Sequence, residues 1–224
     1  MATRGRDWVA WSKPPLFALC LLPLALLAWD ATRGSLGPDP VAQLEHRSGD
    51  WALRLLLATL AVTPLRRLTG VAKLVRYRRM LGLFAFFYVC AHLAIYLLID
   101  LGGYWTQLFD EIAKKPYITA GFAAWLLLIP LAATSTQRMM KRLGRRWQQL
   151  HRLVYAVPLL GVLHYAWMVK SGNVIAHRAP LYYGASFAAL MLWRVPWARL
   201  RGGLRTLRAG TAAATRCPTP AARR

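Results

Sequence analysis

The chain has 224 residues, of which 57% are hydrophobic, and its formal net charge is +22. A mean hydropathy of +0.32 is too high for an ordinary soluble domain of this length. The basic residues lie in blocks between apolar stretches, which favours contact with anionic lipid and argues against nucleic acid as a partner.

Six apolar segments follow one another along the chain: 15–29, 51–65, 80–99, 117–134, 153–169 and 180–193. A straight membrane span needs about 20 apolar residues, and only 80–99 reaches that length without flanking Trp, Tyr and Arg residues. Basic residues precede the first segment, as in a signal peptide, but no small-x-small cleavage pattern follows, so we expect a retained helix. The sequence therefore predicts an all-α, polytopic membrane bundle of about six transmembrane helices.

Charge alternates between the loops that connect these segments. Twenty-three of the 30 basic residues lie in the N-terminus, in loops 66–79 and 137–152, and in the tail from Arg194, whereas seven of the eight acids lie in the other loops. Positive charge marks the cytoplasmic side of a membrane protein. Both termini are therefore expected in the cytoplasm, with loops 30–50, 100–116 and 170–179 outside.

This topology also suggests domain boundaries. We predict a cytoplasmic N-terminus over 1–14 and a membrane domain over 15–198. Residues 199–224 are rich in Arg, Ala, Gly and Thr and have no apolar period, which is typical of a disordered tail that contacts lipid.

Three of the five histidines lie within or at the ends of apolar segments: His92, His151 and His164. An ionisable side chain is costly in that environment and indicates function. His92 lies 13 residues after Arg79, and His164 lies 13 residues after His151. Both distances correspond to about 20 Å from the cytoplasmic face. Two histidines at one depth on two helices can ligate one haem; an interhelical hydrogen bond or a proton path would also explain them.

His151 lies at the cytoplasmic face, and no histidine stands at the base of segment 80–99 to pair with it. On a straight helix, His151 and His164 would point about 140° apart. Only a kink, for which Pro158 is suitably placed, would direct both toward one seam. Cys90 offers a thiolate as a further candidate haem ligand, although a small buried cysteine needs no such role.

No sequence motif for substrate chemistry accompanies the histidines. The chain contains no dinucleotide-binding or P-loop glycine pattern, no G-x-S-x-G and no H-E-x-x-H. No acid lies within the apolar segments, which argues against a proton-coupled carrier. We therefore expect no catalytic site that acts on a substrate.

Several short motifs resemble a known family. They are Thr63-Pro64-Leu65, Arg78-Arg79-Met80-Leu81-Gly82-Leu83 with His92-Leu93 and Tyr96, Pro116-Tyr117-Ile118-Thr119, Thr134-Ser135-Thr136-Gln137, Trp147-Gln148-Gln149-Leu150-His151, and His164-Tyr165. The match covers roughly residues 35–195. Over this range the chain resembles the haem-binding membrane subunits of bacterial protein-methionine-sulfoxide reductase systems, within the ferric-reductase-like transmembrane group.

This resemblance implies an electron-transfer subunit of the bacterial inner membrane. Such a subunit takes electrons from the quinone pool and delivers them to a periplasmic molybdenum-containing catalytic subunit, which reduces methionine sulfoxide in oxidised proteins. The resemblance also implies b-type haem, with His92, His151 and His164 as the candidate axial ligands, and FMN, for which the chain offers no motif.

Two other functions remain as alternatives. Related ferric reductases carry paired histidines on two helices and a soluble flavin–nucleotide domain. This sequence shows neither a second histidine on segment 80–99 nor that domain. A transmembrane metal reductase would thus need a separate flavin donor. A non-redox membrane carrier would use its histidines only structurally.

Overall fold

The computed structural model describes residues 8–170 and 178–194, and every regular element in these ranges is a helix. The all-α prediction is therefore confirmed. The elements are α1 (Trp8–Thr32), α2 (Pro40–Thr69), η1 (Ala72–Val75), α3 (Arg76–Ile95), η2 (Tyr96–Asp100), α4 (Trp105–Lys114), α5 (Pro116–Ala133), α6 (Gln137–Leu143), α7 (Arg145–Leu150), η3 (His151–Tyr155), α8 (Ala156–Lys170) and α9 (Ala179–Arg194). The predicted tail 199–224 lies outside the described residues, as does most of loop 170–179, including His177.

Residues up to Leu190 form one compact unit, and a second unit begins at Met191. Apart from Thr134, which caps α5, each of the six apolar segments lies in one long helical stretch: α1, α2, α3 with η2, α5, η3 with α8, and α9. In the described residues, four stretches are long and apolar enough to cross a membrane: Trp8–Thr32, Ala72–Asp100, Pro116–Ala133 and Arg145–Lys170. The chain is thus a multi-pass membrane protein. α9 has 16 residues, and α2 has 30 with several charges in its first half.

Local sequence signals set the ends of α2 and the start of α5. Asp39 caps α2 by accepting a hydrogen bond from the Ala42 backbone N–H at 3.0 Å, and Pro40 supplies the fixed φ of the first turn. Gly70 ends α2 in the left-handed region at φ 70°, which a residue with a side chain adopts only at a cost. Pro116 opens α5 after an extended Lys115.

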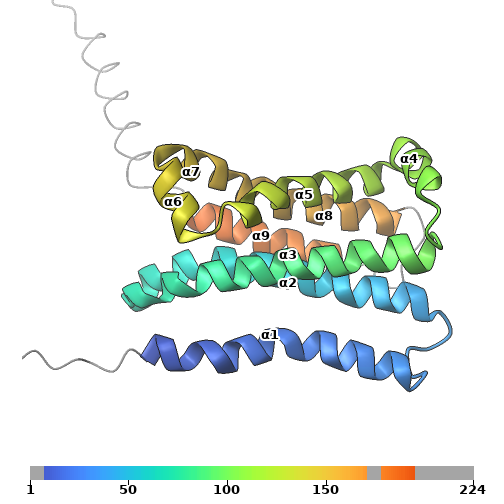
Figure 1. Ribbon diagram of the computed structural model, residues 1–224, viewed down its shortest axis with the longest axis horizontal. Coiled ribbons are helices and arrows are strands. Elements are labelled where there is room, and N and C mark those ends of the chain that lie inside the picture. The colour runs from blue at the N-terminus through green and yellow to red at the C-terminus, as the bar shows by residue number, and fades with distance from the viewer. Residues whose placement is uncertain (1–7, 171–177, 195–224) are drawn as a thin grey trace, which may run out of the picture. The chain divides into compact units, whose positions relative to one another are not determined.

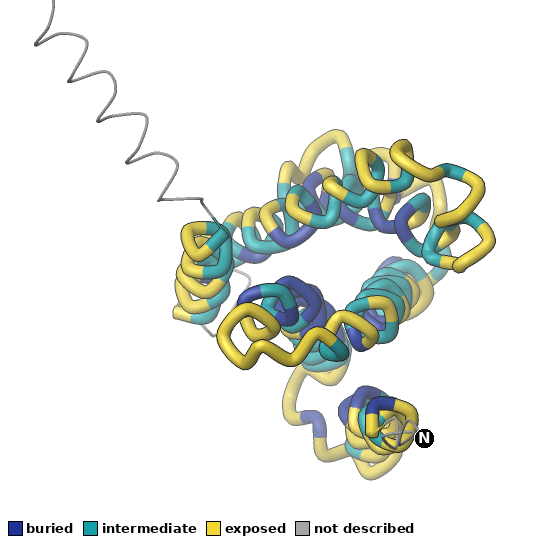
Figure 2. Tube along the Cα trace, turned by 90° about the vertical axis from the view of Figure 1, so that its left-hand side faces the viewer, coloured by how far each residue is buried: buried dark blue, intermediate teal, exposed yellow. Residues whose placement is uncertain are grey.

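The long helices run side by side, with α2 packed along α3 and α5 packed along α8 (Figure 1). Figure 2 looks along the helices and shows that their buried stretches face the interior of the bundle. Tyr88 is fully buried at the contact with α1, where its hydroxyl donates to the Cys20 carbonyl at 2.8 Å and accepts from the Leu24 N–H at 3.1 Å. These two bonds attach α1 to α3.

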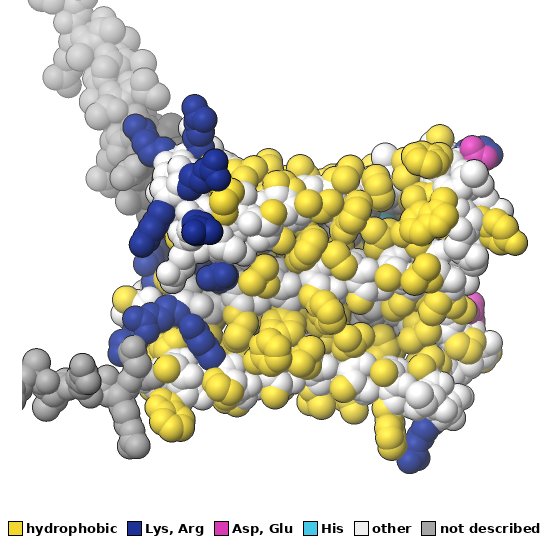
Figure 3. Space-filling view, in the orientation of Figure 1, with side chains coloured by type: hydrophobic (Ala, Val, Ile, Leu, Met, Phe, Trp, Pro, Cys, Tyr) yellow, Lys and Arg dark blue, Asp and Glu magenta, His cyan; other side chains and the backbone are white. Residues whose placement is uncertain are grey.

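Charge separates toward the two ends of the bundle. Figure 3 shows most of the Lys and Arg side chains in view gathered at the end formed by α6, α7 and the start of α3, while the acids in view lie at the opposite end. The apolar band between them is the surface that a bilayer would cover.

Candidate functional site

A cavity of about 590 Å³ lies between α2, α3, α5 and α8, and α4 covers part of it at the acidic end. This volume falls within the range of about 300–1,000 Å³ that cofactor and ligand sites occupy. The inner wall is apolar and includes Leu53, Leu56, Leu128 and Val157. The wall nearest α4 is polar and includes Asp39, Glu45, Asp100, Gln107, Glu111 and Lys115. The cavity therefore suits an amphipathic ligand with one polar edge.

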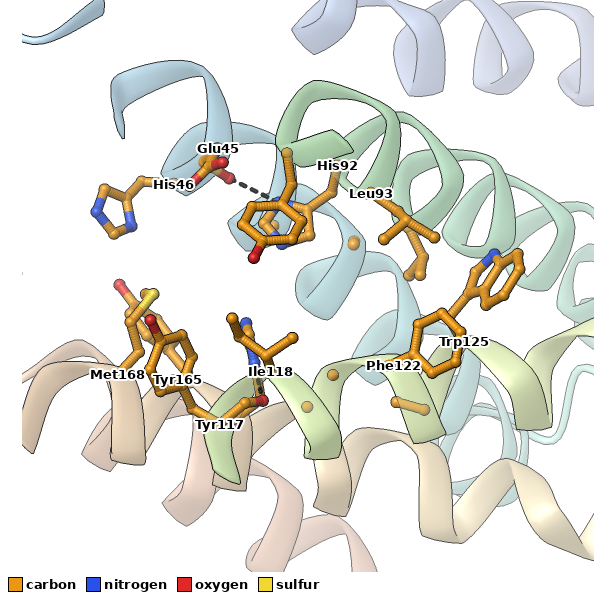
Figure 4. Close-up of a pocket in the computed structure, with 18 of the residues that line it drawn as sticks. Glu45, His46, His92, Leu93, Tyr117, Ile118, Phe122, Trp125, Tyr165 and Met168 are labelled. Carbon is orange, nitrogen blue, oxygen red and sulfur yellow. Dashed lines mark hydrogen bonds between the residues drawn. The ribbon is translucent and has the colours of Figure 1, made fainter. Parts of the chain in front are cut away.

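Two histidines face each other across this cavity. His92 extends from α3 and His164 from α8, and their ring centres are 6.2 Å apart with the ring planes at 80°. Figure 4 shows His92 directed into the cavity, with Tyr117 and Ile118 of α5 on the opposite wall. The equal depths read from the sequence thus correspond to a direct juxtaposition of the two rings.

Backbone carbonyls hold both rings through the same nitrogen. His92 Nδ1 lies 3.0 Å from the Glu45 carbonyl, and His164 Nδ1 lies 2.6 Å from the Tyr117 carbonyl. A carbonyl can only accept, so each Nδ1 carries the proton and each Nε2 keeps its lone pair. This second-shell arrangement is the one that metal-binding histidines usually show.

Two glycines leave room for the rings. A Cβ atom at Gly121 of α5 would lie 2.8 Å from His164 Nδ1, and one at Gly49 of α2 would lie 3.3 Å from His92 Nδ1. Glycine is unfavourable inside a helix unless the space is needed. Each glycine therefore lets a helix backbone approach one of the two imidazoles closely.

The spacing of the rings fits a single metal between them. Metal–imidazole bonds measure about 2.0 Å and an imidazole centre lies about 1.1 Å behind its nitrogen, so two imidazoles on one metal have ring centres about 6 Å apart. Among the described residues, no group of three or more His, Cys, Asp or Glu side chains could hold a metal ion by itself. A porphyrin leaves two axial positions open on its iron, and two imidazoles can fill both.

His151 lies elsewhere. It begins the 3-10 helix η3, so the stretch from His151 to His164 is helical but not, as the sequence spacing assumed, α-helical throughout. Its ring stacks on Trp147, with ring centres 3.9 Å apart, and its Nδ1 lies 3.2 Å from the Trp147 carbonyl. It is not among the residues that line the cavity.

Sequence reasoning missed several residues of this site. Gly49 and Gly121 were not singled out, although glycines within helical segments were the available signal. The carbonyls of Glu45 and Tyr117 carry no signal, because every residue has one. Three further cavity-lining groups have buried polar atoms with no hydrogen-bond partner in the described part of the chain: Glu45 Oε1, Tyr96 Oη and Trp125 Nε1. Buried polar atoms without a partner indicate that the cavity takes a ligand with polar groups.

Comparison with known proteins identifies the family of the chain. The family model described as "Ferric reductase like transmembrane component" matches residues 48–162. "Protein-methionine-sulfoxide reductase heme-binding subunit MsrQ" of Xanthomonas axonopodis pv. citri is 54% identical over 89% of this chain and 92% of its own length. The subunit of the same name from Caulobacter vibrioides is 51% identical over 79% of this chain and 82% of its own length. The chain belongs to the MsrQ family.

The family match runs through the elements that build the cavity. It includes Gly49, His92 and Gly121, and His164 follows two residues after its end. The MsrQ relatives are named for haem binding. No solved structure matches the chain.

Proposed function

We propose that the chain holds a b-type haem between His92 and His164 and passes electrons as the membrane subunit of a methionine-sulfoxide reductase system. The observation that carries the proposal is the pair of imidazoles 6.2 Å apart, each with its Nδ1 bound to a backbone carbonyl. The names of the relatives support both the haem and the system.

In this proposal the haem supplies a one-electron carrier inside the membrane. The chain's own groups fix the ligands: the carbonyls of Glu45 and Tyr117 orient the rings and leave the Nε2 lone pairs available. The apolar inner wall excludes water and keeps the site in a low-dielectric environment. The glycines at 49 and 121 let helices α2 and α5 close against the ligands.

The proposal assigns the ligand role to His92 and His164 and gives His151 a structural one. The stack of His151 on Trp147 supports this division, because Trp147 in turn donates from Nε1 to the Thr134 carbonyl at 2.9 Å. Together these contacts tie the start of η3 to the end of α5. A second haem on His151 would need a partner ligand at that end of the bundle.

We further propose six transmembrane helices in a bacterial inner membrane, with both termini in the cytoplasm. Charge separation along the bundle supports this orientation (Figure 3). The polar wall of the cavity lies at the acidic end, which this orientation places on the periplasmic side, so a haem would be close to a periplasmic acceptor. The quinone pool as electron donor and a molybdenum-containing subunit as acceptor follow from the family resemblance. FMN, implied by the resemblance alone, stays a prediction and has no part in the proposal.

The test is electron transfer with separated components. The purified chain, loaded with haem and reduced by a quinol, should not reduce methionine sulfoxide by itself. Addition of the soluble catalytic subunit and oxidised protein substrate should reoxidise the haem and produce methionine. Sustained turnover by this chain alone, with quinol or nicotinamide as donor, would contradict the assignment as a subunit.

A further inference from the structure

The polar edge of the cavity carries a second set of groups, beyond the two histidines. Haem b is amphipathic: its ring is apolar, and its two propionate groups are carboxylates on one edge. The cavity has the same asymmetry, with an apolar inner wall and a polar wall beside α4. A buried carboxylate needs hydrogen-bond donors or cations, since an unpaired charge is costly away from water.

Tyr96 is the first donor at this edge. It follows His92 by four residues, so it lies about 6 Å farther toward the acidic end. It is the first residue of the π-helical turn η2, and it lines the cavity. Its hydroxyl oxygen is buried and has no hydrogen-bond partner in the described residues. A donor in this condition is satisfied when a ligand acceptor binds beside it.

Lys115 is the second group. It precedes Tyr117, whose carbonyl holds His164, so it is displaced from that ligand in the same direction as Tyr96 is from His92. Five carboxylates line the cavity, at Asp39, Glu45, Asp50, Asp100 and Glu111. Within the described residues, Lys115 is the only Lys or Arg side chain among the lining groups. Its amine contacts the Glu111 carboxylate, and that hydrogen bond raises the pKa of the lysine, which keeps it charged.

We propose that Tyr96 and Lys115 bind the propionate carboxylates of the haem at the polar edge of the cavity. The Tyr96 hydroxyl donates a hydrogen bond to one carboxylate oxygen. Lys115 has three N–H donors, so it can bind a propionate while keeping its bond to Glu111. These contacts would fix the rotation of the haem about the His92–His164 axis, which two axial ligands alone leave free. The inference rests on the proposed function, because it requires the haem to lie between the two histidines.

The test removes the propionate contacts either from the haem, by masking its carboxylates, or from the protein, by replacing Tyr96 and Lys115. Apoprotein is reconstituted in detergent with haem or with haem dimethyl ester, in which both carboxylates are masked, and the two dissociation constants are compared. The wild type should bind the ester about tenfold or more weakly than haem, since hydrogen bonds to charged groups are the strong ones. Tyr96→Phe and Lys115→Gln should each reduce this preference several-fold, and the double variant should bind both forms equally. The ratio is measured within each variant, so a general loss of stability cancels.

Two matched controls lie beside these residues. Lys114 is paired with Asp110 and its side chain is 71% exposed, and Tyr104 is 65% exposed; neither lines the cavity. Lys114→Gln and Tyr104→Phe should keep the full preference for haem. A double variant that still prefers haem as strongly as the wild type overturns the proposal, and so does a Lys114→Gln effect equal to that of Lys115→Gln. A wild-type chain that binds neither form overturns the proposed function itself.

Discussion

Two backbone carbonyls determine which nitrogen each histidine of the cavity presents. Glu45 lies in the first turns of α2 and Tyr117 in the first turn of α5, yet each carbonyl reaches a histidine of another helix. Such a bond fixes both the tautomer and the direction of the ring before a ligand arrives. The site is therefore ordered by the packing of α2 on α3 and of α5 on α8.

The glycines provide a graded test of this packing. Gly121→Ala places a Cβ 2.8 Å from His164 Nδ1, so the ring or α5 must move, at a cost of about 1–3 kcal/mol. Gly49→Ala, at 3.3 Å from His92, should be milder. We expect haem content to fall strongly in Gly121→Ala and less in Gly49→Ala, as measured by pyridine haemochrome per polypeptide. Gly82→Ala on α3, whose Cβ would be 3.8 Å from Thr59, is the control and should match the wild type.

His151 should be separable from the two cavity histidines. Because it stacks on Trp147 outside the cavity, His151→Ala should leave the spectrum of the haem between His92 and His164 unchanged. Its effect should appear as a lower yield of folded protein, with a loss of stability of about 1 kcal/mol for the stacked pair. If His151→Ala removes the same spectral component as His164→Ala, the two-histidine site is wrong.

At the scale of elements, α4 has one face toward the cavity and another that is exposed. Gln107, Leu108 and Glu111 on one face line the cavity, and Leu108 is buried. Trp105 and Phe109 lie on another face and are 59% and 73% exposed. A short helix with polar and exposed aromatic faces at the end of a membrane bundle is typical of the lipid interface. We infer that lipid holds α4 over the cavity.

Spin labels on adjacent positions of α4 can test this placement. In a cysteine-free background, a nitroxide at Phe109→Cys should collide with oxygen, which dissolves in lipid. A nitroxide at Asp110→Cys should collide with a water-soluble nickel complex, because Asp110 is exposed beside Lys114. The measurement is power-saturation EPR in liposomes. Equal access of the nickel complex to both labels would show that α4 lies in water.

At the scale of the whole molecule, the orientation across the membrane follows from charge. Most of the basic side chains in view lie at the end with α6 and α7, and the acids in view lie at the opposite end, so Arg142 and Asp110 should lie in opposite compartments. Reporter fusions at these two residues should give activity from a cytoplasmic reporter at Arg142 and from a periplasmic one at Asp110. Reports from the same side at both residues would rule out the six-helix topology.

The sequence predicted much of this fold because lipid restricts the options. A spanning segment must satisfy its own backbone hydrogen bonds, so an apolar run of sufficient length is a helix. The segment 80–99 was read correctly as helical, but its π-helical end from Tyr96 was not foreseen. The 3-10 turn from His151 to Tyr155 was also not foreseen. Local departures of this kind depend on neighbouring helices and leave little trace in apolar periodicity.

The site was predictable in part for the same reason. His92 and His164 stood out because ionisable groups are costly in an apolar segment, and their equal depth follows from helix rise. The partners of their Nδ1 atoms could not be predicted, because they are carbonyls from residues 47 positions away in both cases. The placement of Lys115 at the cavity depends on the turn between α4 and α5, which no local pattern reveals.

The measurement that tests the central claim most directly is the EPR spectrum of the oxidised protein and its ligand variants. The ring planes of His92 and His164 are at 80°, so the wild type should give the strongly anisotropic low-spin signal of a haem with nearly perpendicular imidazoles. His92→Ala and His164→Ala should each remove that signal, and the double variant should be no worse than either single one. A low-spin signal that survives unchanged in His92→Ala or in His164→Ala would contradict the claim that both histidines bind one haem.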